Sequence, residues 1–231
     1  MKKAFQLKTL LLSMAVAGAA TIAVAPATAQ AGVSANVGFV TDYIFRGVNQ
    51  STSKGSPALQ GGFDYEHDSG LFAGVWASTM DTEYEYDLYA GWGGSVNGFD
   101  LGVMYTNYSY TDKVAYAPGA SSFEEVNLSA GYGPVSVGLD MDVDPDITNY
   151  VHYSVSLDAS AVAEGVSLTY GATMTDRNSA GYKAKDAGYL DVGYATDVEG
   201  FDLGVDVIFS DANTDNTTYF VVGLSKSFDL M

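Results

Sequence analysis

The chain contains no cysteine, which excludes a disulfide-stapled scaffold and any thiol chemistry. Basic residues are also scarce: 10 Lys and Arg stand against 28 Asp and Glu, and the formal net charge is −18. A protein that binds nucleic acid carries a basic face, so this balance argues against nucleic acid as a partner. An acidic disordered chain is excluded as well, because 17 Tyr, 11 Phe and 2 Trp need somewhere to pack.

Long apolar runs are absent after residue 31, so no later stretch approaches the roughly 20 residues of a membrane-spanning helix. Residues 1–31 combine three lysines, an apolar stretch from Leu10 to Ala25 and an A-x-A cleavage site at Ala29-Gln30-Ala31, with Ala27-Thr28-Ala29 as a second site. We expect a cleaved signal peptide over 1–31 rather than an anchoring helix, because the run lacks a stop-transfer flank. The mature chain, 32–231, is then one exported domain with a net charge of −21 (−18 − 3 = −21).

What the sequence does have, from Ser34 to Phe228, is alternation of apolar and polar side chains. Alternation at period two indicates strands with one dry face and one wet face. In an exported chain whose strands nearly all alternate, it predicts an all-β, antiparallel up-and-down transmembrane β-barrel, with the apolar face toward lipid and the polar face lining a lumen. A soluble β-sandwich would alternate too, but it predicts no regular exchange of long and short connections.

Turn residues divide the chain into twelve strand candidates, most of them near the length that a tilted transmembrane strand requires. We expect them at 33–46, 56–67, 70–79, 83–93, 98–110, 121–133, 134–143, 148–158, 164–175, 186–196, 199–210 and 216–228. With the N-terminus in the periplasm, connections after odd-numbered strands should be long and external, and the others short. Two external connections, Met80-Asp81-Thr82 and Asp144–Ile147, are short and break this rhythm.

Aromatic residues near strand ends on the apolar face are expected to form girdles at the two membrane–water interfaces. They are Tyr43, Phe45, Tyr84, Tyr86, Trp92, Phe99, Tyr132, Phe201, Phe209 and Phe228. The segment from Gly223 to Phe228 resembles the C-terminal assembly signal of outer-membrane proteins, a glycine followed by a final aromatic. Lys226, where a hydrophobic residue is usual, and the three residues after Phe228 depart from that signal.

A more specific pattern lies in the first 80 residues. Its pieces are Thr41-Asp42-Tyr43-Ile44-Phe45-Arg46-Gly47 with Gln50, the stretch from Pro57 to Tyr65, Ser69-Gly70, Ala73-Gly74 and Trp76-Ala77-Ser78, together with the ending Ser225-Lys226-Ser227-Phe228. This set resembles the TorF family of porin-like proteins, also described as the Gcw_chp domain, whereas residues 113–186 match only in their strand rhythm. The resemblance implies a Gram-negative outer-membrane barrel that acts as a pore.

The parity of the first predicted strand places Asp42 and Arg46 on the lumen face. Arg46 is one of two arginines, and the other, Arg177, falls in a predicted external loop. An inward arginine among carboxylates would set up a transverse field that orients solutes. The simpler alternative is a structural role for Arg46, as an ion pair with Asp42 or a hydrogen bond to Gln50.

Carboxylates gather on the predicted lumen face, where rings of them favour cations over anions. The set is Asp64, Glu66, Glu83, Glu85, Asp87, Asp100, Glu125, Asp140, Asp142, Asp158, Asp191, Asp202 and Asp206. Those near strand ends can serve solvation alone, so the mid-strand Asp87, Asp191 and Asp206 are the better selectivity candidates. Twelve strands lie between the eight that close around packed side chains and the sixteen of an open channel, which predicts a narrow bore.

These features predict an outer-membrane channel for passive diffusion of small solutes, with no enzymatic activity and no cofactor. The expected partners are outer-membrane lipid and lipopolysaccharide, the barrel assembly machinery and the solutes themselves. A non-conducting structural or adhesive barrel, whose external loops act, stays open as an alternative. Acidic loops such as 142–146 and 211–216 are expected to be solvated rather than metal-bound, because no EF-hand spacing is present.

A lipid hydrolase is the third class. His152-Tyr153-Ser154 has the His and Ser spacing of outer-membrane phospholipases, which place these residues on the outside of the barrel. Here Tyr153 belongs to the apolar face, so His152 and Ser154 should point inward, away from lipid. No catalytic residue is therefore predicted.

Overall fold

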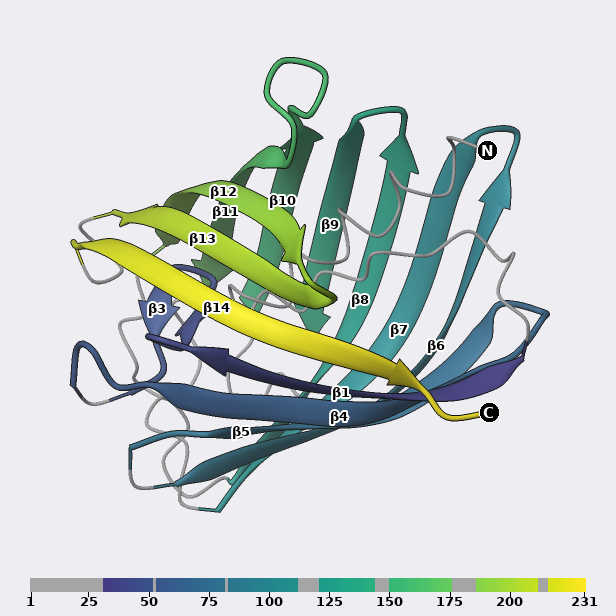
Figure 1. Cartoon of the computed structure of the whole chain (residues 1–231), viewed down its shortest axis with the longest axis horizontal. Coiled ribbons are helices and arrows are strands. Elements are labelled where there is room, and N and C mark those ends of the chain that lie inside the picture. The colour runs from purple at the N-terminus through teal and green to yellow at the C-terminus, as the bar shows by residue number, and fades with distance from the viewer. Residues whose placement is uncertain are drawn as a thin grey trace.

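The computed structural model describes residues 31–51, 53–81, 83–111, 121–143, 150–175, 186–211 and 216–231, so the expected signal peptide lies almost wholly outside the described residues. Twelve strands form one closed antiparallel barrel, in which β14 returns to pair with β1 (Figure 1). The barrel strands are β1 (Gly32–Val40), β4 (Ala58–Glu66), β5 (Leu71–Thr79), β6 (Tyr84–Val96), β7 (Phe99–Tyr110), β8 (Ser122–Tyr132), β9 (Val135–Asp142), β10 (Tyr150–Asp158), β11 (Val166–Thr175), β12 (Ala187–Val198), β13 (Phe201–Ser210) and β14 (Thr218–Asp229). The predicted twelve-stranded barrel is confirmed.

Side chains point in and out as the alternation predicts. In β6, Glu85 and Asp87 are buried inside the barrel, whereas Tyr84 and Leu88 on the other face are 60% and 57% exposed. β5 is apolar on both faces, and its inward face carries Phe72, Trp76 and the buried Ser78. No helix in the described part of the chain is long and apolar enough to cross a membrane.

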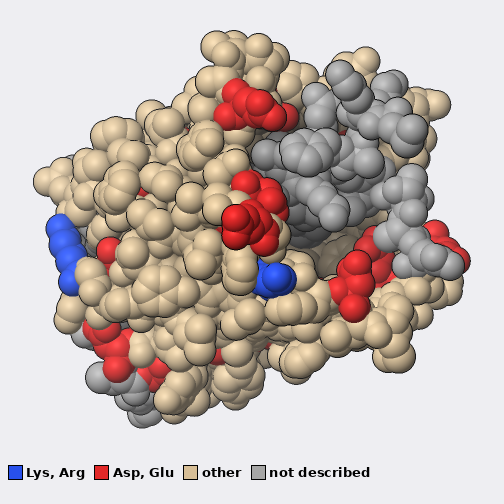
Figure 2. All heavy atoms as spheres, in the orientation of Figure 1, with Lys and Arg blue, Asp and Glu red and all other residues tan. Residues whose placement is uncertain are grey.

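The outer surface has the polarity that a lipid-facing wall requires. Large apolar side chains are exposed on the outside of the strands, while carboxylates are buried inside, the reverse of a soluble protein. Figure 2 shows that lysines and arginines are few on the face drawn, and that carboxylates form separate patches within a broad surface of other residues. This inverted arrangement makes the interior of the barrel the place to look for function.

The two ends of the barrel differ. At the end that holds Gly32 and Asp229, short turns join the strands, and we call it the turn end; the opposite end is the loop end. Between β6 and β7, the turn-end connection is only Asn97-Gly98, with φ of 53° and 84°. This pair of left-handed residues forms the two-residue turn whose twist matches antiparallel strands.

The first strand is shorter than predicted. β1 ends at Val40 rather than at residue 46, and the chain then turns into the barrel, where β2 (Ile44–Phe45) pairs with β3 (Val48–Asn49). We call residues 44–49 the inner hairpin; β3 is labelled in Figure 1. Its turn, Arg46-Gly47, has φ of 50° and 79°, a left-handed pair in which glycine avoids the strain of a side chain.

The inner hairpin also corrects two residues assigned to the aromatic girdle. Tyr43 is buried in an apolar cluster inside the lumen, and Phe45 packs against that cluster instead of facing lipid. The physical reason lies in the sequence: Tyr43, Ile44 and Phe45 are three large apolar residues in a row, and one face of such a run would have to enter a wet lumen. A segment that fills the lumen can bury all three.

Candidate functional site in the barrel lumen

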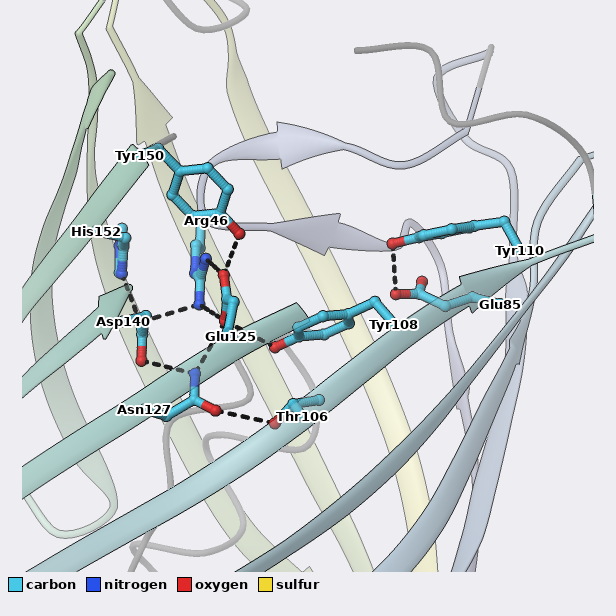
Figure 3. Close-up of polar contacts among 10 residues, drawn as sticks. All are labelled: Arg46, Glu85, Thr106, Tyr108, Tyr110, Glu125, Asn127, Asp140, Tyr150 and His152. Atoms are coloured by element: carbon cyan, nitrogen blue, oxygen red, sulfur yellow. Dashed lines mark hydrogen bonds and ion pairs between the residues drawn. The ribbon is translucent and has the colours of Figure 1, made fainter. Parts of the chain in front are cut away.

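Arg46 lies at the tip of the inner hairpin and reaches the wall formed by β8 and β9 (Figure 3). Its Nη1 and Nη2 donate to the two carboxylate oxygens of Glu125, at 2.6 and 2.9 Å, and Nη2 also lies 2.9 Å from Asp140 Oδ2. Glu125 is 0% exposed and Asp140 is 4% exposed, so water does not screen these contacts. We call Arg46, Glu125 and Asp140 the Arg46 cluster, a charge-assisted and bidentate contact of the strongest kind.

Polar side chains of three strands, β7, β8 and β10, complete the hydrogen bonds of the Arg46 cluster. Asn127 Nδ2 donates to Glu125 Oε2 at 2.9 Å and to Asp140 Oδ1 at 3.0 Å, and Asn127 Oδ1 in turn accepts from Thr106 Oγ1 at 2.9 Å. The hydroxyls of Tyr108 and Tyr150 donate to Glu125. His152 Nδ1 lies 2.8 Å from Asp140 Oδ2 (Figure 3). A hydrogen-bonded network of this kind holds its members in place, although the buried Nε2 of His152 has no hydrogen-bond partner among the described residues. The tip of the inner hairpin is therefore held against the wall.

The charges of the Arg46 cluster do not cancel. Burial by itself would lower the pKa of Arg46, but the adjacent Glu125 and Asp140 carboxylates outweigh it and raise that pKa well above its ordinary value. Arg46 therefore stays protonated, with one positive charge facing two carboxylates. Among the described residues, no other Lys or Arg side chain is buried inside the barrel, and none forms an ion pair with Asp87, Asp191 or Asp206.

The partners that the sequence suggested for Arg46 are wrong, although an ion pair was among the alternatives. Asp42 Oδ1 instead accepts the backbone N–H of Gly55 at 2.6 Å, and Gln50 Nε2 donates to the carbonyl of Val48 at 3.0 Å. Arg46 is not on a wall strand either, because β1 ends before it. The inner hairpin carries the Arg46 side chain across the lumen to the two carboxylates. Glu125, one of them, lies 79 residues away in the sequence.

The three mid-strand selectivity candidates all face the lumen, in two separate places. Asp87 lies on β6, while Asp191 and Asp206 lie close together on the adjacent strands β12 and β13. Each has one buried carboxylate oxygen without a hydrogen-bond partner among the described residues. Their role in selectivity stays a prediction.

The lumen has two unlike halves. The loop half, nearest the loop end, is filled by the inner hairpin and by large inward side chains of the wall. These buried side chains include Tyr108, Tyr110, Phe123, Tyr189, Ile208, Tyr219 and Val221. The turn half is lined by small and acidic inward residues that are partly exposed, including Gly91, Gly102, Gly131, Ser136, Ser167, Asp64, Asp100, Asp158 and Asp202.

Sequence reasoning found Glu125 and Asp140 as lumen carboxylates but did not distinguish them from the other acids. It missed Asn127 and Tyr150 as members of the surrounding network. Parity alone was enough to place both inside, because Asn127 shares a face with Glu125 and Tyr150 shares a face with His152. No signal in the sequence indicated that Arg46 would meet them.

His152 and Ser154 lie inside the barrel, both buried. His152 is engaged with Asp140 and stacks on Tyr189 at 6.1 Å between ring centroids, so it does not face lipid. Among the described residues, no three His, Asp or Glu side chains are grouped so as to hold a metal ion. The acidic loops 142–146 and 211–216 lie mostly outside the described residues.

The proposed assembly signal lies on the strand that closes the barrel. Gly223 pairs with Val40 and Phe228 pairs with Ala35, so the seam between β14 and β1 runs through this segment. Lys226 lies on the outer face with its Nζ 4.5 Å from the centroid of the Phe201 ring, which keeps its charge against an aromatic face near the turn end. Recognition of Gly223 and Phe228 by the assembly machinery stays a prediction.

Known proteins with the same barrel include the KdgM porin, which is 10% identical, with a TM-score of 0.55 over 84% of this chain and 99% of that chain. A protein from work on the mechanism of in-meso crystallization of membrane proteins is also 10% identical, with a TM-score of 0.56 over 87% of this chain and 84% of its own. At such identity the likeness shows the fold alone.

No curated protein matches the chain. One family profile does, over residues 24–160, and its family is described as a bacterial protein of unknown function, Gcw_chp. The match extends well past the first 80 residues, into the region where the sequence resembled the family only in its strand rhythm. The TorF naming of that resemblance stays a prediction. Because the matched residues make up more than half of this chain, the chain belongs to the Gcw_chp family.

Proposed function

We propose that this protein is a porin-like channel of the Gram-negative outer membrane, through which small solutes diffuse passively. The observation that carries the proposal is the inverted polarity of the closed barrel. Exposed apolar side chains cover its outer face, and carboxylates, Asp87 and Asp206 among them, line its lumen. Lipid accounts for the first feature and a hydrated path for charged or polar solutes accounts for the second.

The channel is narrow and prefers cations. Arg46 is the one arginine buried in the described part of the barrel, and the carboxylates of Glu125 and Asp140 already neutralise its charge. Asp87, Asp191 and Asp206 face the lumen with no cationic partner in the described part of the chain, so they attract cations and repel anions. The outer-membrane lipids and lipopolysaccharide surround the barrel in this function, and the barrel assembly machinery inserts it.

A second candidate is favoured by one specific observation. The loop half of the lumen is filled, which suits a structural or adhesive barrel that does not conduct. A lipid hydrolase is disfavoured, because His152 and Ser154 are buried in the lumen and away from lipid. Electrical recording separates the first two candidates directly.

The test is the reversal potential of refolded protein in a planar bilayer across a potassium chloride gradient. We expect potassium to be preferred, and more strongly at low salt, where charges are less screened. Replacing Asp87, Asp191 and Asp206 together by Asn should move the reversal potential toward zero.

The matched control removes three charges at the turn end, as Asp68→Asn, Glu164→Gln and Asp229→Asn, all at exposed residues. It should change the reversal potential far less than the lumen variant. An anion-preferring wild type, or equal effects of the two variants, would refute the proposed path. Folded protein without any conductance, also after the inner hairpin is removed, would favour the non-conducting barrel.

A further inference from the structure

We propose that the inner hairpin is a plug that closes the lumen, and that the Arg46 cluster is the latch that holds it. This inference rests on the proposed channel function and goes beyond it, because it assigns the resting protein a closed state. The channel then conducts when residues 44–49 leave the loop half. The supporting observations are the path of the hairpin, its contacts with opposite walls and its weak internal structure.

The hairpin spans the full width of the barrel. On one side, the Ser210 hydroxyl of β13 donates to the carbonyl of Gly47. On the other side, the Phe45 ring packs on Tyr108 of β7, with 5.9 Å between ring centroids. In the ring of twelve strands β7 and β13 are six positions apart, so these contacts lie on diametrically opposite walls.

Simple dimensions indicate how much of the bore is filled. Twelve strands with the usual spacing and tilt close on a circle roughly 24 Å across between backbones. A two-stranded layer that packs face to face on both walls occupies about 10 Å on each side. The hairpin with its contacting side chains therefore takes up most of the width, and the burial agrees: Ile44 and Tyr108 are each 1% exposed and Val221 is 0% exposed.

The hairpin is held by its surroundings rather than by itself. Its two strands have two residues each, and an isolated two-stranded hairpin is at best marginally stable. Arg46 also has a φ of 50°, a conformation that is strained for a residue with a side chain. If the contacts of Arg46 with Glu125 and Asp140 break, the hairpin keeps its apolar packing and the hydrogen bond from Ser210 but loses its charged contacts with the wall.

The base of the hairpin remains anchored when the tip leaves. Thr41 N donates to the carbonyl of Val222 at 2.9 Å, and Val222 N donates to Thr41 Oγ1 at 2.9 Å, so the start of the segment is tied to β14. Release therefore moves the tip about a fixed base and does not open the barrel wall. It also uncovers Glu125 and Asp140, which adds two carboxylates to the open path.

Removal of the hairpin is the direct test. The carbonyl of Tyr43 already accepts the N–H of Gln50 at 2.9 Å, so Asn-Gly in place of residues 44–49 closes the chain with a tight turn. We expect the wild type to be closed for most of the recording, and the deletion variant to conduct steadily. Arg46→Met should raise the ratio of open to closed time roughly 100-fold or more, because the buried carboxylates lose their partner.

The matched control is Lys54→Gln, in the same loop but outside the lumen, where Lys54 Nζ contacts Thr217 Oγ1. It should leave the open fraction unchanged. Each variant is first shown to be folded by its heat-dependent shift on a gel. If the wild type conducts steadily and the deletion variant passes the same current, the plug is refuted and the channel function stands. If both are silent, the plug and the channel function fail together.

A second measurement needs no deletion. The chain has no cysteine, so a single introduced thiol reports one position without background. In the closed state, Ile44→Cys should react with a water-soluble maleimide at least about 100-fold more slowly than Ser53→Cys on the exposed part of the loop, because only local opening reaches it. Glu125→Gln should speed the labelling of Ile44→Cys. Equal labelling rates at the two positions would contradict a closed plug.

Discussion

The loop half and the turn half of the lumen share one wall but differ in what fills them. In the loop half, the inner hairpin and inward aromatic rings exclude water, and even Glu125 is fully buried. In the turn half, small inward residues such as Gly102 and Ser136 leave their neighbours partly exposed, Asp158 and Asp202 among them. The alternation of the strands is the same in both, so the size of the inward side chains decides which half is dry.

The comparison teaches where electrostatics is strong in this protein. A hydrogen bond or ion pair in the loop half is shielded from water, so losing it leaves a buried group without a partner. The same contact in the turn half can be replaced by water at small cost. Equal chemical changes in the two halves should therefore have unequal effects.

The largest difference in the loss of unfolding free energy between the two halves is expected for a change at Arg46. Arg46→Met keeps the apolar stem but leaves Glu125 and Asp140 without their cation, which should lower the free energy of unfolding by about 3 kcal/mol. The control in the turn half is Asp158→Asn, since Asp158 is partly exposed and its Oδ1 accepts the N–H of Ser160 at 2.9 Å. Denaturant unfolding in detergent micelles, followed by tryptophan fluorescence, measures both. Similar losses for the two variants would mean that the loop half is not dry.

The next largest difference in stability cost is expected for alanine at two glycines, Gly171 beside the buried Tyr189 and Gly74 beside the partly exposed Tyr89. A Cβ at Gly171 would lie 2.4 Å from Cε1 of Tyr189, and a Cβ at Gly74 would lie 2.4 Å from the hydroxyl of Tyr89. Tyr189 is buried and lies against Gly47 of the inner hairpin, so its ring cannot yield, and Gly171→Ala should cost about 2 kcal/mol.

Tyr89, in contrast, is partly exposed and can swing into the wet turn half. Gly74→Ala should therefore cost less than about 1 kcal/mol. Unfolding midpoints of the two alanine variants, measured side by side, test the contrast. A larger loss for Gly74→Ala would show that the turn half is the more tightly packed of the two.

The fold was predictable because its main signal is local. Alternation assigned the inward face of β6 correctly, and turn residues placed most strand ends within two or three residues, although the turn expected at residues 94–97 is Asn97-Gly98 in the structure. A barrel needs little more than this, since each strand pairs with its neighbour in the chain. The exception is β1, where the sequence was read as continuing to residue 46, although the apolar run Tyr43-Ile44-Phe45 breaks the alternation.

The site was predictable only in part, because its contacts are not local. Parity placed Asp87, Asp191 and Asp206 inside, and this needs no knowledge of the other strands. The contact of Arg46 with Glu125 joins a loop to a distant strand, and it depends on how the loop crosses a closed ring. Nothing in the spacing of these two residues encodes that crossing.

The smallest expected difference concerns two tyrosine hydroxyls that make the same kind of contact. Tyr150 donates to Glu125 in the loop half, and Tyr89 donates to Asp64 in the turn half. Tyr150→Phe should cost about 1.5 kcal/mol, because Glu125 loses a donor that water cannot replace. Tyr89→Phe should cost only about 0.5 kcal/mol, because the partly exposed Asp64 can bind water instead.

Both changes remove one oxygen atom and keep the ring, so packing is nearly constant. The difference between the two losses of unfolding free energy therefore reports how well water reaches Glu125 and Asp64. Denaturant unfolding of the two single variants and of the double variant measures it, and the losses should add because the sites are separate. A loss for Tyr89→Phe as large as that for Tyr150→Phe would place Asp64 in a dry environment. The boundary between the two halves would then lie closer to the turn end than the exposure of Asp64 indicates.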